Sequence, residues 1–260
     1  MDLDTKVFSR KYHSSFRDLF TKSNNIWFIH YSCESFTNTK SGLPPKVVCI
    51  VVQRYGSSQQ KSFCSHFEQV FGGNDERKAS EAPGSIDDKE ALSDFFCWLK
   101  NDTTRHFVHW RMRSSFFGFE ALEKRFTIVG GRPHKVLDNQ KHDLPEILRN
   151  IYGNSFSDNS KMDSVMHMNE ISVNDFLSGL EELEALRNNN LNAVFRSTQR
   201  KVRTFSFITE LAIDKKLKKR AGPEKHLRMQ SKVDMIKDHW VFVILSFVLV
   251  VLSFFATLLV

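Results

Sequence analysis

Two stretches decide the fold: Ile26–Phe36, which reads IWFIHYSCESF, and Lys46–Arg54, which reads KVVCIVVQR. Both are rich in β-branched and aromatic side chains and are bounded by polar segments, as is typical of buried strands. The first strand is expected over Ile26–Cys33. Lys61–Phe67 predicts a further strand that returns beside Lys46–Arg54 as a hairpin. The chain therefore opens on a sheet.

The rest of the chain alternates between helical and extended patterns. Gly72–Asp88 is polar and contains Gly, Pro and Ser, which predicts an exposed loop. A strand followed mostly by helices indicates an α/β fold, in which helices flank a mixed sheet. The expected elements are helices at Lys89–Lys100, Ser115–Val129, Asp143–Tyr152, Val173–Arg187 and Asn192–Leu217, and a strand at Arg105–Trp110.

The composition is that of one domain with an appendage. The chain has 260 residues, of which 41% are hydrophobic and 24 are Phe, so a sizeable core is expected. Collagen, wholesale disorder and a polytopic membrane protein are excluded. The cysteines lack zinc-finger spacing and are interpreted as reduced thiols in the core of a cytosolic domain. They are Cys33, Cys49, Cys64 and Cys97.

The last part of the chain, Trp240–Val260, reads WVFVILSFVLVVLSFFATLLV and contains no charge, Pro or Gly. At 1.5 Å per residue it would span roughly the 30 Å hydrocarbon core of a bilayer. A buried core helix of this length is the alternative, but it would show a polar face. The run therefore predicts a membrane helix, with Trp240 at its start.

The positive charge lies immediately before this run. Lys215–Lys237 carries nine basic and two acidic residues, and its +7 equals the net charge of the whole chain. Basic residues beside a membrane helix favour the cytoplasmic side and anionic lipids. We therefore expect a single-pass protein of the inner (cytoplasmic) membrane whose soluble domain is cytoplasmic.

Residues 1–25 show apolar side chains at helical spacing with basic residues between them. The segment has no long apolar run and is not a secretory signal. A basic amphipathic helix can lie on a membrane or bind a partner. The alternative is that it docks on its own domain.

Several motifs occur in the order found in 3′–5′ exonucleases with four acidic metal-binding residues, which have a ribonuclease-H-like fold. That family ends its first strand in Asp-x-Glu, where this chain has Ser32 and Glu34. A later strand ends in His-Asn-x-x-Phe-Asp, where HWRMRS provides His109 and Ser114. DLPEILRNIYG resembles the following helix, and Asp175 is the candidate for the acidic residue of the last helix. The chain thus resembles a degenerate member of this family over residues 26–187.

The resemblance implies two divalent metals bound by four carboxylates, but only Glu34 and Asp175 remain as vestigial catalytic candidates. Ser32 and Ser114 are neutral and cannot hold a pair of Mg²⁺ ions. We therefore expect no metal site, no cofactor and no catalysis, in a domain that kept its substrate groove. An active membrane-tethered 3′–5′ exonuclease is the alternative.

Two clusters combine cations with aromatic side chains, which can contact phosphates and stack on bases. The predicted nucleic-acid-binding residues are His109, Trp110, Arg111 and Arg113 in the first cluster and Arg200 and Lys201 in the second, which also contains Arg196 and Arg203. For the first cluster, the alternative is that the tryptophan lies in the core and the arginines are solvated. For the second, the alternative is that this helix face lies toward anionic lipid.

The whole architecture resembles the transmembrane effectors of bacterial anti-phage systems, with the Hailong-type effector the nearest. The resemblance implies that an oligonucleotide or nucleotide signal, supplied by a partner nucleotidyltransferase, controls membrane disruption. A tail-anchored, protein-binding adaptor is the remaining alternative. The expected divisions are 1–25, an amphipathic helix; 26–190, the exonuclease-like domain; 191–214, a connecting helix; 215–239, a basic linker; and 240–260, the membrane helix.

A single helix cannot enclose an aqueous path, so a pore requires a homo-oligomer, for which a tetramer is one arrangement. Ser246, Ser253 and Thr257 fall close to one face of the expected membrane helix. Small hydroxyl residues permit close helix approach and hydrogen bonds between helices. Bonding of the same hydroxyls to their own backbone is the alternative.

Overall fold

The computed structural model describes residues 3–22, 25–34, 43–65, 87–154, 156–157 and 161–219. Its centre is a five-stranded sheet in the order β3-β2-β1-β4-β5. Strands β1, β2 and β3 are antiparallel neighbours, whereas β4 runs parallel to β1 and β5 runs parallel to β4. The strands are β1 (Ile26–Cys33), β2 (Val47–Arg54), β3 (Gln60–Cys64), β4 (His106–His109) and β5 (Lys141–Asp143).

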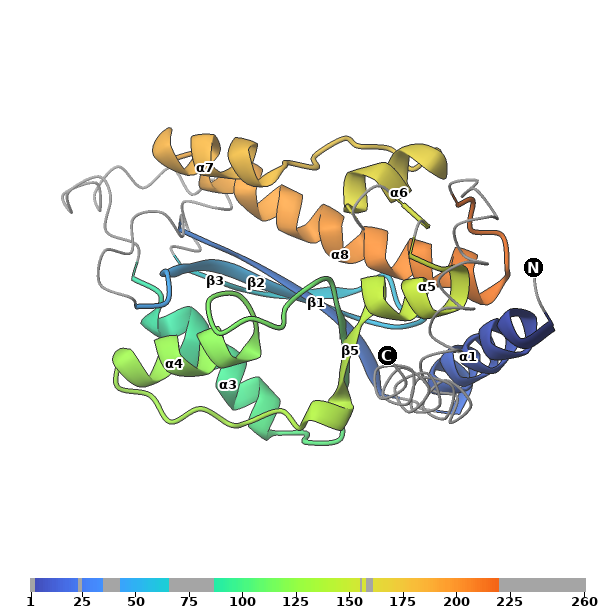
Figure 1. The fold of residues 1–260 in the computed structure, drawn as a ribbon. Coiled ribbons are helices and arrows are strands. Elements are labelled where there is room, and N and C mark those ends of the chain that lie inside the picture. Colours follow the sequence, from blue (N-terminus) through green and yellow to red (C-terminus); the bar gives the residue numbers. More distant parts are fainter. Residues whose placement is uncertain are drawn as a thin grey trace, which may run out of the picture.

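Helices cover both faces of this sheet, with α8 along one face and α3 and α4 on the other (Figure 1). Side chains alternate along β1, so Phe28 packs on the α8 side and Ile29 on the α3 side. The helices are α1 (Leu3–Lys22), α3 (Lys89–Lys100), α4 (Phe119–Ile128), α5 (Leu144–Tyr152), α6 (Met162–Met168), α7 (Gly179–Arg187) and α8 (Leu191–Ile213), with a 3₁₀ turn at Asp138–Gln140.

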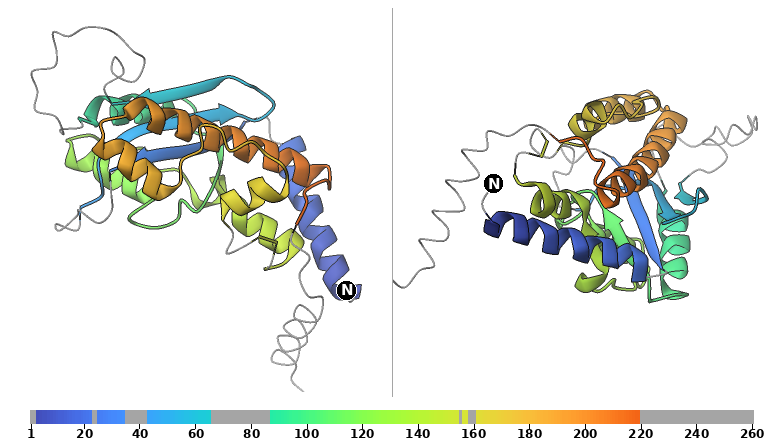
Figure 2. Two further views of the ribbon diagram at one scale, coloured as in Figure 1. Left: turned by 90° about the horizontal axis from the view of Figure 1, so that it is seen from above. Right: turned by 90° about the vertical axis from the view of Figure 1, so that its right-hand side faces the viewer.

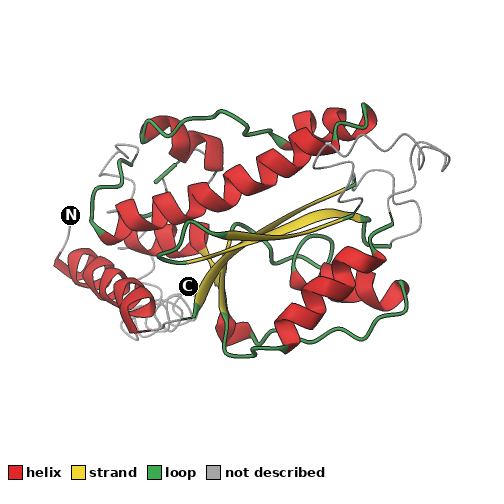
Figure 3. Cartoon of the chain, turned by 180° about the vertical axis from the view of Figure 1, so that it is seen from behind, coloured by secondary structure: helices red, strands yellow, loops and turns green. Residues whose placement is uncertain are grey.

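The predicted class is confirmed: the fold is α/β, with a mixed sheet between helices (Figure 3), and it is compatible with a ribonuclease-H-like fold. Strand β2 is buried from Val47 to Gln53, which explains its continuous apolar sequence. Strand β5 was not predicted because its sequence, KHD, contains no apolar residue. Helix α6 is only seven residues long and was also missed.

Helix α4 begins at Phe119, four residues later than expected from the helical pattern. The preceding residue, Gly118, approaches the backbone of Met112 closely: a Cβ at this position would lie 2.5 Å from the Met112 carbonyl oxygen. Only glycine permits this approach. Residues 111–118 therefore form an irregular segment between β4 and α4.

Helix α8 belongs to the core, although residues 191–214 were expected to connect the domain to the membrane. Val202, Phe205 and Ile208 are fully buried, and α8 packs across β1 and β2. The physical reason is that α8 carries buried apolar residues along its length, and these pack on the sheet (Figure 2). The packed domain therefore includes α8 and extends beyond the expected boundary at residue 190.

Helix α1 docks on the same domain. Phe16 and Phe20 are buried in the core, and Nε2 of His13 lies 2.9 Å from the carbonyl oxygen of Ala212 in α8. Helices α1 and α5 lie side by side (Figure 2). This arrangement corresponds to the alternative in which the N-terminal helix covers its own domain.

All four cysteines are free thiols. Cys49 is buried and Cys33 and Cys64 are partly buried, but Cys97 lies exposed on α3. The expectation of core thiols is therefore wrong for Cys97, which falls on the outer side of an amphipathic helix.

Among the described residues, no helix is both long enough and apolar enough to cross a membrane. The expected membrane helix, with Trp240, Ser246, Ser253 and Thr257, lies outside them, as do most of the predicted loop at Gly72–Asp88 and most of the basic linker.

Candidate nucleic-acid interface

A buried polar cluster joins the end of β1 to α7 and α8. The Ser32 and Thr198 hydroxyls lie 2.6 Å apart, and Lys201 Nζ donates a hydrogen bond of 2.6 Å to Glu182 Oε1. The same carboxylate oxygen accepts a 2.8 Å bond from Ser197 Oγ and a longer one from Ser32. We call these five residues the Lys201 cluster.

The Lys201 cluster is internally neutralised. The side chain of Lys201 is 7% exposed and that of Glu182 is 16% exposed, so the ammonium and the carboxylate satisfy each other away from water. The prediction that Lys201 binds nucleic acid is therefore corrected: its position on α8 turns it toward β1. The Lys201 ammonium group therefore lies at the end of β1, where the exonuclease resemblance implies carboxylates.

The two vestigial catalytic candidates do not share a site. The charged neighbours of Glu34 are Lys46, Arg125 and Asp88, and burial raises the pKa of Glu34 although the two cations oppose this. Asp175 lies instead in an exposed turn beside α8, with a φ of 59°. No common metal site can form from Glu34 and Asp175 in this arrangement.

Asp175 is also not on a helix, because α7 begins only at Gly179. Ser178 caps this helix: its hydroxyl accepts from the Glu181 amide, and the Glu181 carboxylate accepts from the Ser178 amide. The sequence Ser-x-x-Glu is a capping box and would have placed the start of the helix correctly.

At the end of β4, His109 and Trp110 are buried rather than presented to a ligand strand. The Trp110 ring stacks on Phe205 of α8, with centroids 5.9 Å apart and planes 16° from parallel. His109 is 1% exposed. The base-stacking role predicted for Trp110 is therefore corrected in favour of the core position, because α8 covers that side of the sheet.

The neighbouring arginines surround Asp143, which was not among the site residues predicted from the sequence. The Arg111 amide donates to Asp143 Oδ1 over 3.0 Å, and Arg113 Nε donates to Oδ2 over 2.9 Å. Arg113 also forms an ion pair with Glu146. Arg113 is thus exposed but already paired with two carboxylates, which weakens its predicted role as a phosphate ligand.

Burial raises the pKa of Asp143, although the Arg111 amide and the nearby arginines oppose this. The sequence Asp-Leu-Pro could have marked Asp143 as the residue before a helix, because Asp is favoured at the N-cap and Pro in the first turn. Asp143 indeed precedes α5.

A hollow of about 320 Å³ opens at the same end of the sheet, between β4, the 3₁₀ turn and the start of α4. We call it the β4 hollow. Burial, assisted by Arg113, His142 and Lys141, lowers the pKa of His109 to about 3, so its ring is neutral at pH 7. The lining residues are His109, Met112, Arg113, Ser114, Phe119, Glu120, Asp138 and Lys141.

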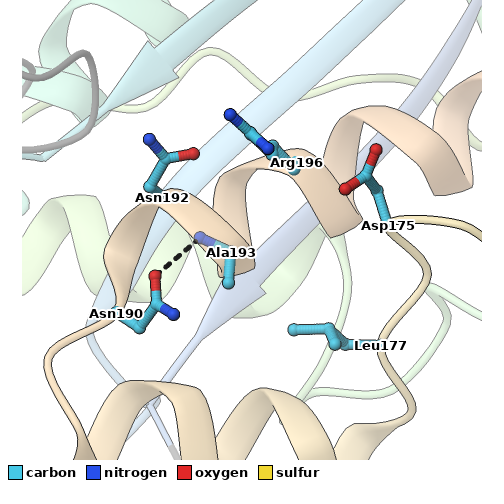
Figure 4. Close-up of a pocket in the computed structure, with 6 residues that line it drawn as sticks. All are labelled: Asp175, Leu177, Asn190, Asn192, Ala193 and Arg196. Carbon is cyan, nitrogen blue, oxygen red and sulfur yellow. Dashed lines mark hydrogen bonds between the residues drawn. The ribbon is translucent and has the colours of Figure 1, made fainter.

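A second concave region lies along the outer side of α8. It consists of two hollows, of about 340 and 350 Å³, that share Asp175 and Arg196 as lining residues. We call it the α8 groove. Figure 4 shows the first hollow, where Asp175 comes from the loop before α7, Arg196 comes from α8, and the Asn190 side chain accepts a hydrogen bond from the Ala193 amide.

Three arginines of α8 line the second hollow: Arg196, Arg200 and Arg203. We call them the arginine row. Arg196 and Arg203 are exposed and, within the described part of the chain, form no ion pair. Arg200 donates from Nη2 to the carbonyl of Ser172, and its Nε is buried without a partner among the described residues. The predicted second cluster is therefore brought together, apart from Lys201.

The described residues contain no group of three or more His, Cys, Asp or Glu side chains arranged to hold a metal ion. Histidines do gather at β4 and β5, where His106 Nδ1 lies 3.0 Å from His142 Nε2. Burial and the proximity of His106 lower the pKa of His142 to about 4.

No protein-family model matches the chain, and no curated protein matches it either. Among solved structures, it is similar to the family B DNA polymerase from the hyperthermophilic archaeon Pyrobaculum calidifontis, at 13% identity and a TM-score of 0.46. The match covers 72% of this chain and 24% of the polymerase chain, so this chain spans about a quarter of that protein's length. A similarity at this level identifies neither a family nor an activity.

Proposed function

We propose that this chain is a membrane-anchored effector of bacterial anti-phage defence, whose exonuclease-like domain binds a single-stranded DNA oligomer or nucleotide signal without cleaving it. The observation that carries the binding function is the arginine row. It places three guanidinium groups along one concave surface, and Asp175 is the one carboxylate among its described lining residues.

The spacing of the arginine row suits a phosphate backbone. Positions 196, 200 and 203 recur about once per helical turn, so the guanidinium groups follow the helix axis as a line. Guanidinium groups bind phosphate oxygens through two parallel hydrogen bonds. The side-chain amides of Asn174, Asn192 and Gln199 in the same groove supply further donors. Such contacts give affinity with little sequence preference.

The Lys201 cluster supports the absence of catalysis. Two-metal hydrolysis requires hard oxygen ligands that converge on two ions. Here the first-strand position is Ser32, and the nearest carboxylate, Glu182, is bound to an ammonium group. A divalent ion bound by Glu182 would have to displace the Lys201 ammonium group from this carboxylate.

The proposed effect on the membrane is based on the sequence of residues 215–260. We propose that signal binding in the cytoplasmic domain alters the packing of Trp240–Val260 helices in a homo-oligomer and permeabilises the inner membrane. A neighbouring nucleotidyltransferase gene would support this arrangement.

The binding function is tested with the full chain in detergent micelles and a fluorescently labelled single-stranded DNA oligomer. We expect binding without cleavage in Mg²⁺ or Mn²⁺. In the double variant Arg196→Ala/Arg203→Ala, the slope of log affinity against log salt should fall by about 1.4, since each lost phosphate contact on a single strand contributes about 0.7.

The matched control is Arg54→Ala/Arg132→Ala, which removes two exposed arginines outside the groove and should leave the slope nearly unchanged. Equal slopes for both double variants would exclude the α8 groove as the binding surface. Cleavage that disappears in Glu34→Gln would identify an active nuclease, and a folded chain that neither binds nor cleaves DNA would favour a protein-binding adaptor.

A further inference from the structure

The imidazole of His109 supplies a hydrogen-bond donor to the β4 hollow, and a contact with the backbone determines which ring nitrogen carries the proton. The Met112 amide lies 3.3 Å from Nδ1 of His109 and, being an N–H group, can only donate. Nδ1 must therefore be the unprotonated acceptor of the ring, which places the proton of the neutral imidazole on Nε2.

This Nε2–H group has no acceptor within the part of the chain that the structure describes. His109 is 1% exposed, yet it is one of the residues that line the hollow. Because His109 lines the hollow, a ligand there that supplies an acceptor can accept a hydrogen bond from this group.

The charges around the hollow are already compensated. Arg113 is held by Asp143 and Glu146, and Lys141 Nζ lies 3.0 Å from Asp138 Oδ1. With the imidazole neutral as well, the lining residues that the structure describes offer no free cation to select a phosphate. It therefore differs from the α8 groove, where Arg196 and Arg203 have no such partners among the described residues.

The other walls suit a flat heterocycle. Phe119 packs edge to face with the His109 ring, with centroids 6.0 Å apart, and Met112 contributes a polarisable apolar surface. The Glu120 carboxylate lines the hollow and has acceptor capacity beyond its ion pair with Lys124. The volume of about 320 Å³ is within the usual range for small-ligand sites.

We infer that the β4 hollow binds a neutral nucleobase that carries a ring nitrogen or carbonyl acceptor next to an exocyclic amino group. His109 Nε2–H donates to the acceptor, and Glu120 accepts from the amino group. This inference deepens the proposed function, on which it rests, by adding base recognition to phosphate binding. The base belongs either to a free nucleoside or nucleotide or to the end of a strand.

The test measures cytidine and uridine binding to the full chain in detergent micelles by isothermal titration. Cytidine, which offers a ring acceptor and an amino group, should bind more tightly than uridine. His109→Asn keeps an acceptor near the Nδ1 position for the Met112 amide but, being shorter, places no donor at the Nε2 position, so cytidine affinity should fall by about tenfold or more. His109→Gln, which places an amide donor near the Nε2 position, should retain more of the affinity.

Glu120→Gln provides a second variant, because Glu120 is exposed and its replacement should not disturb folding. It should reduce the preference for cytidine over uridine. The inference is overturned if neither nucleoside binds the folded wild-type chain at millimolar concentration, or if Glu120→Gln and a folded His109→Asn both bind cytidine as the wild type does.

The arginine-row variant separates this inference from the proposed function. Arg196→Ala/Arg203→Ala should weaken oligomer binding and leave cytidine binding unchanged. Oligomer binding without cytidine binding would refute the base site alone, whereas cytidine binding without oligomer binding would refute the proposed DNA-oligomer function alone. A labelled oligomer that competes with cytidine would assign the pocket to the end of a strand, and one that does not would assign it to a free nucleoside or nucleotide.

Discussion

The two faces of α8 both carry cationic side chains, but the cation is buried and paired on one face and the cations are exposed on the other. On the inward face Lys201 is buried and bound to Glu182, and on the outward face Arg196 and Arg203 are exposed in the α8 groove. Arg200 and Lys201 are adjacent in sequence, yet only Arg200 lines the groove. A helix turns by about 100° per residue, so adjacent cations point to different surroundings.

The difference shows that a cluster of cations in a sequence need not be a binding surface. The inward cation holds α7 and α8 to β1 through the Lys201 cluster, and its removal should affect stability first. The outward cations support no described ion pair, and their removal should affect ligand binding first. The following experiments test this division, from the largest expected effect to the smallest.

Lys201→Met should reduce the free energy of unfolding by about 3–5 kcal/mol, because it leaves the largely buried Glu182 carboxylate without its counter-ion. Urea denaturation of the full chain in detergent measures this. The double variant Lys201→Met/Glu182→Leu should recover much of the loss, since no charge is left unpaired. A single variant as stable as the wild type would show that the inward cation is not structural.

Trp110→Ala should cost about 3 kcal/mol of stability, because a large core aromatic side chain is removed from its stack on Phe205. The same denaturation experiment applies. Phe207→Ala on the outward side of α8, where the ring is 46% exposed, is the matched control and should change stability by less than about 0.5 kcal/mol. Equal losses would contradict the core assignment of Trp110.

The inward face should also make stability depend on pH. Burial, followed by the charge of Lys201, holds the pKa of His30 well below its usual value near 6.5. The unfolded chain therefore binds the proton more readily. The contribution of neutral His30 to stability is complete above about pH 6.5 and is lost as the pH falls below it.

His30→Phe should consequently lose less stability than the wild type between pH 7 and pH 5, as measured by the urea midpoint at each pH. The pKa values of His109 and His142 are lowered to about 3 and about 4, so these residues also reduce stability as the pH falls, and both remain in the variant. The raised pKa of Asp143 has the opposite effect and increases stability as the pH falls. An identical pH dependence in variant and wild type would exclude His30 as a contributor.

The smallest effect is expected from Arg203→Ala on the outward face. Stability should stay within about 0.5 kcal/mol of the wild type, because Arg203 is exposed and makes no ion pair among the described residues. The salt slope of oligomer binding should fall by about 0.7. An unchanged slope would remove Arg203 from the proposed contact.

Local sequence predicted the strands and long helices well where the apolar pattern was strong. Helix α3 spans Lys89–Lys100, as its spacing indicated, and β1 spans Ile26–Cys33. The predictions were poorer where polar residues or special backbone geometry decide the structure. Strand β5 has no apolar residue, and the delayed start of α4 depends on the contact of Gly118 with Met112.

The candidate site was predicted only in part. The arginine row follows from its spacing on one helix, which is local information. The burial of Trp110 depends on α8, a helix that lies about 90 residues away in the chain and covers the end of β4. Similarly, Glu182 meets Ser32 across a separation of 150 residues, and no local pattern reports such a contact.

The sequence by itself determined the α/β class, the strong strands and helices and the line of arginines on one helix, because periodicity and side-chain type are local properties. Only the tertiary structure decided which cations face water, where Asp175 lies and which imidazole nitrogen of His109 carries the proton. Each of these depends on what another segment places opposite the residue. The desolvation and hydrogen bonding that fix a charge arise only when those segments pack together.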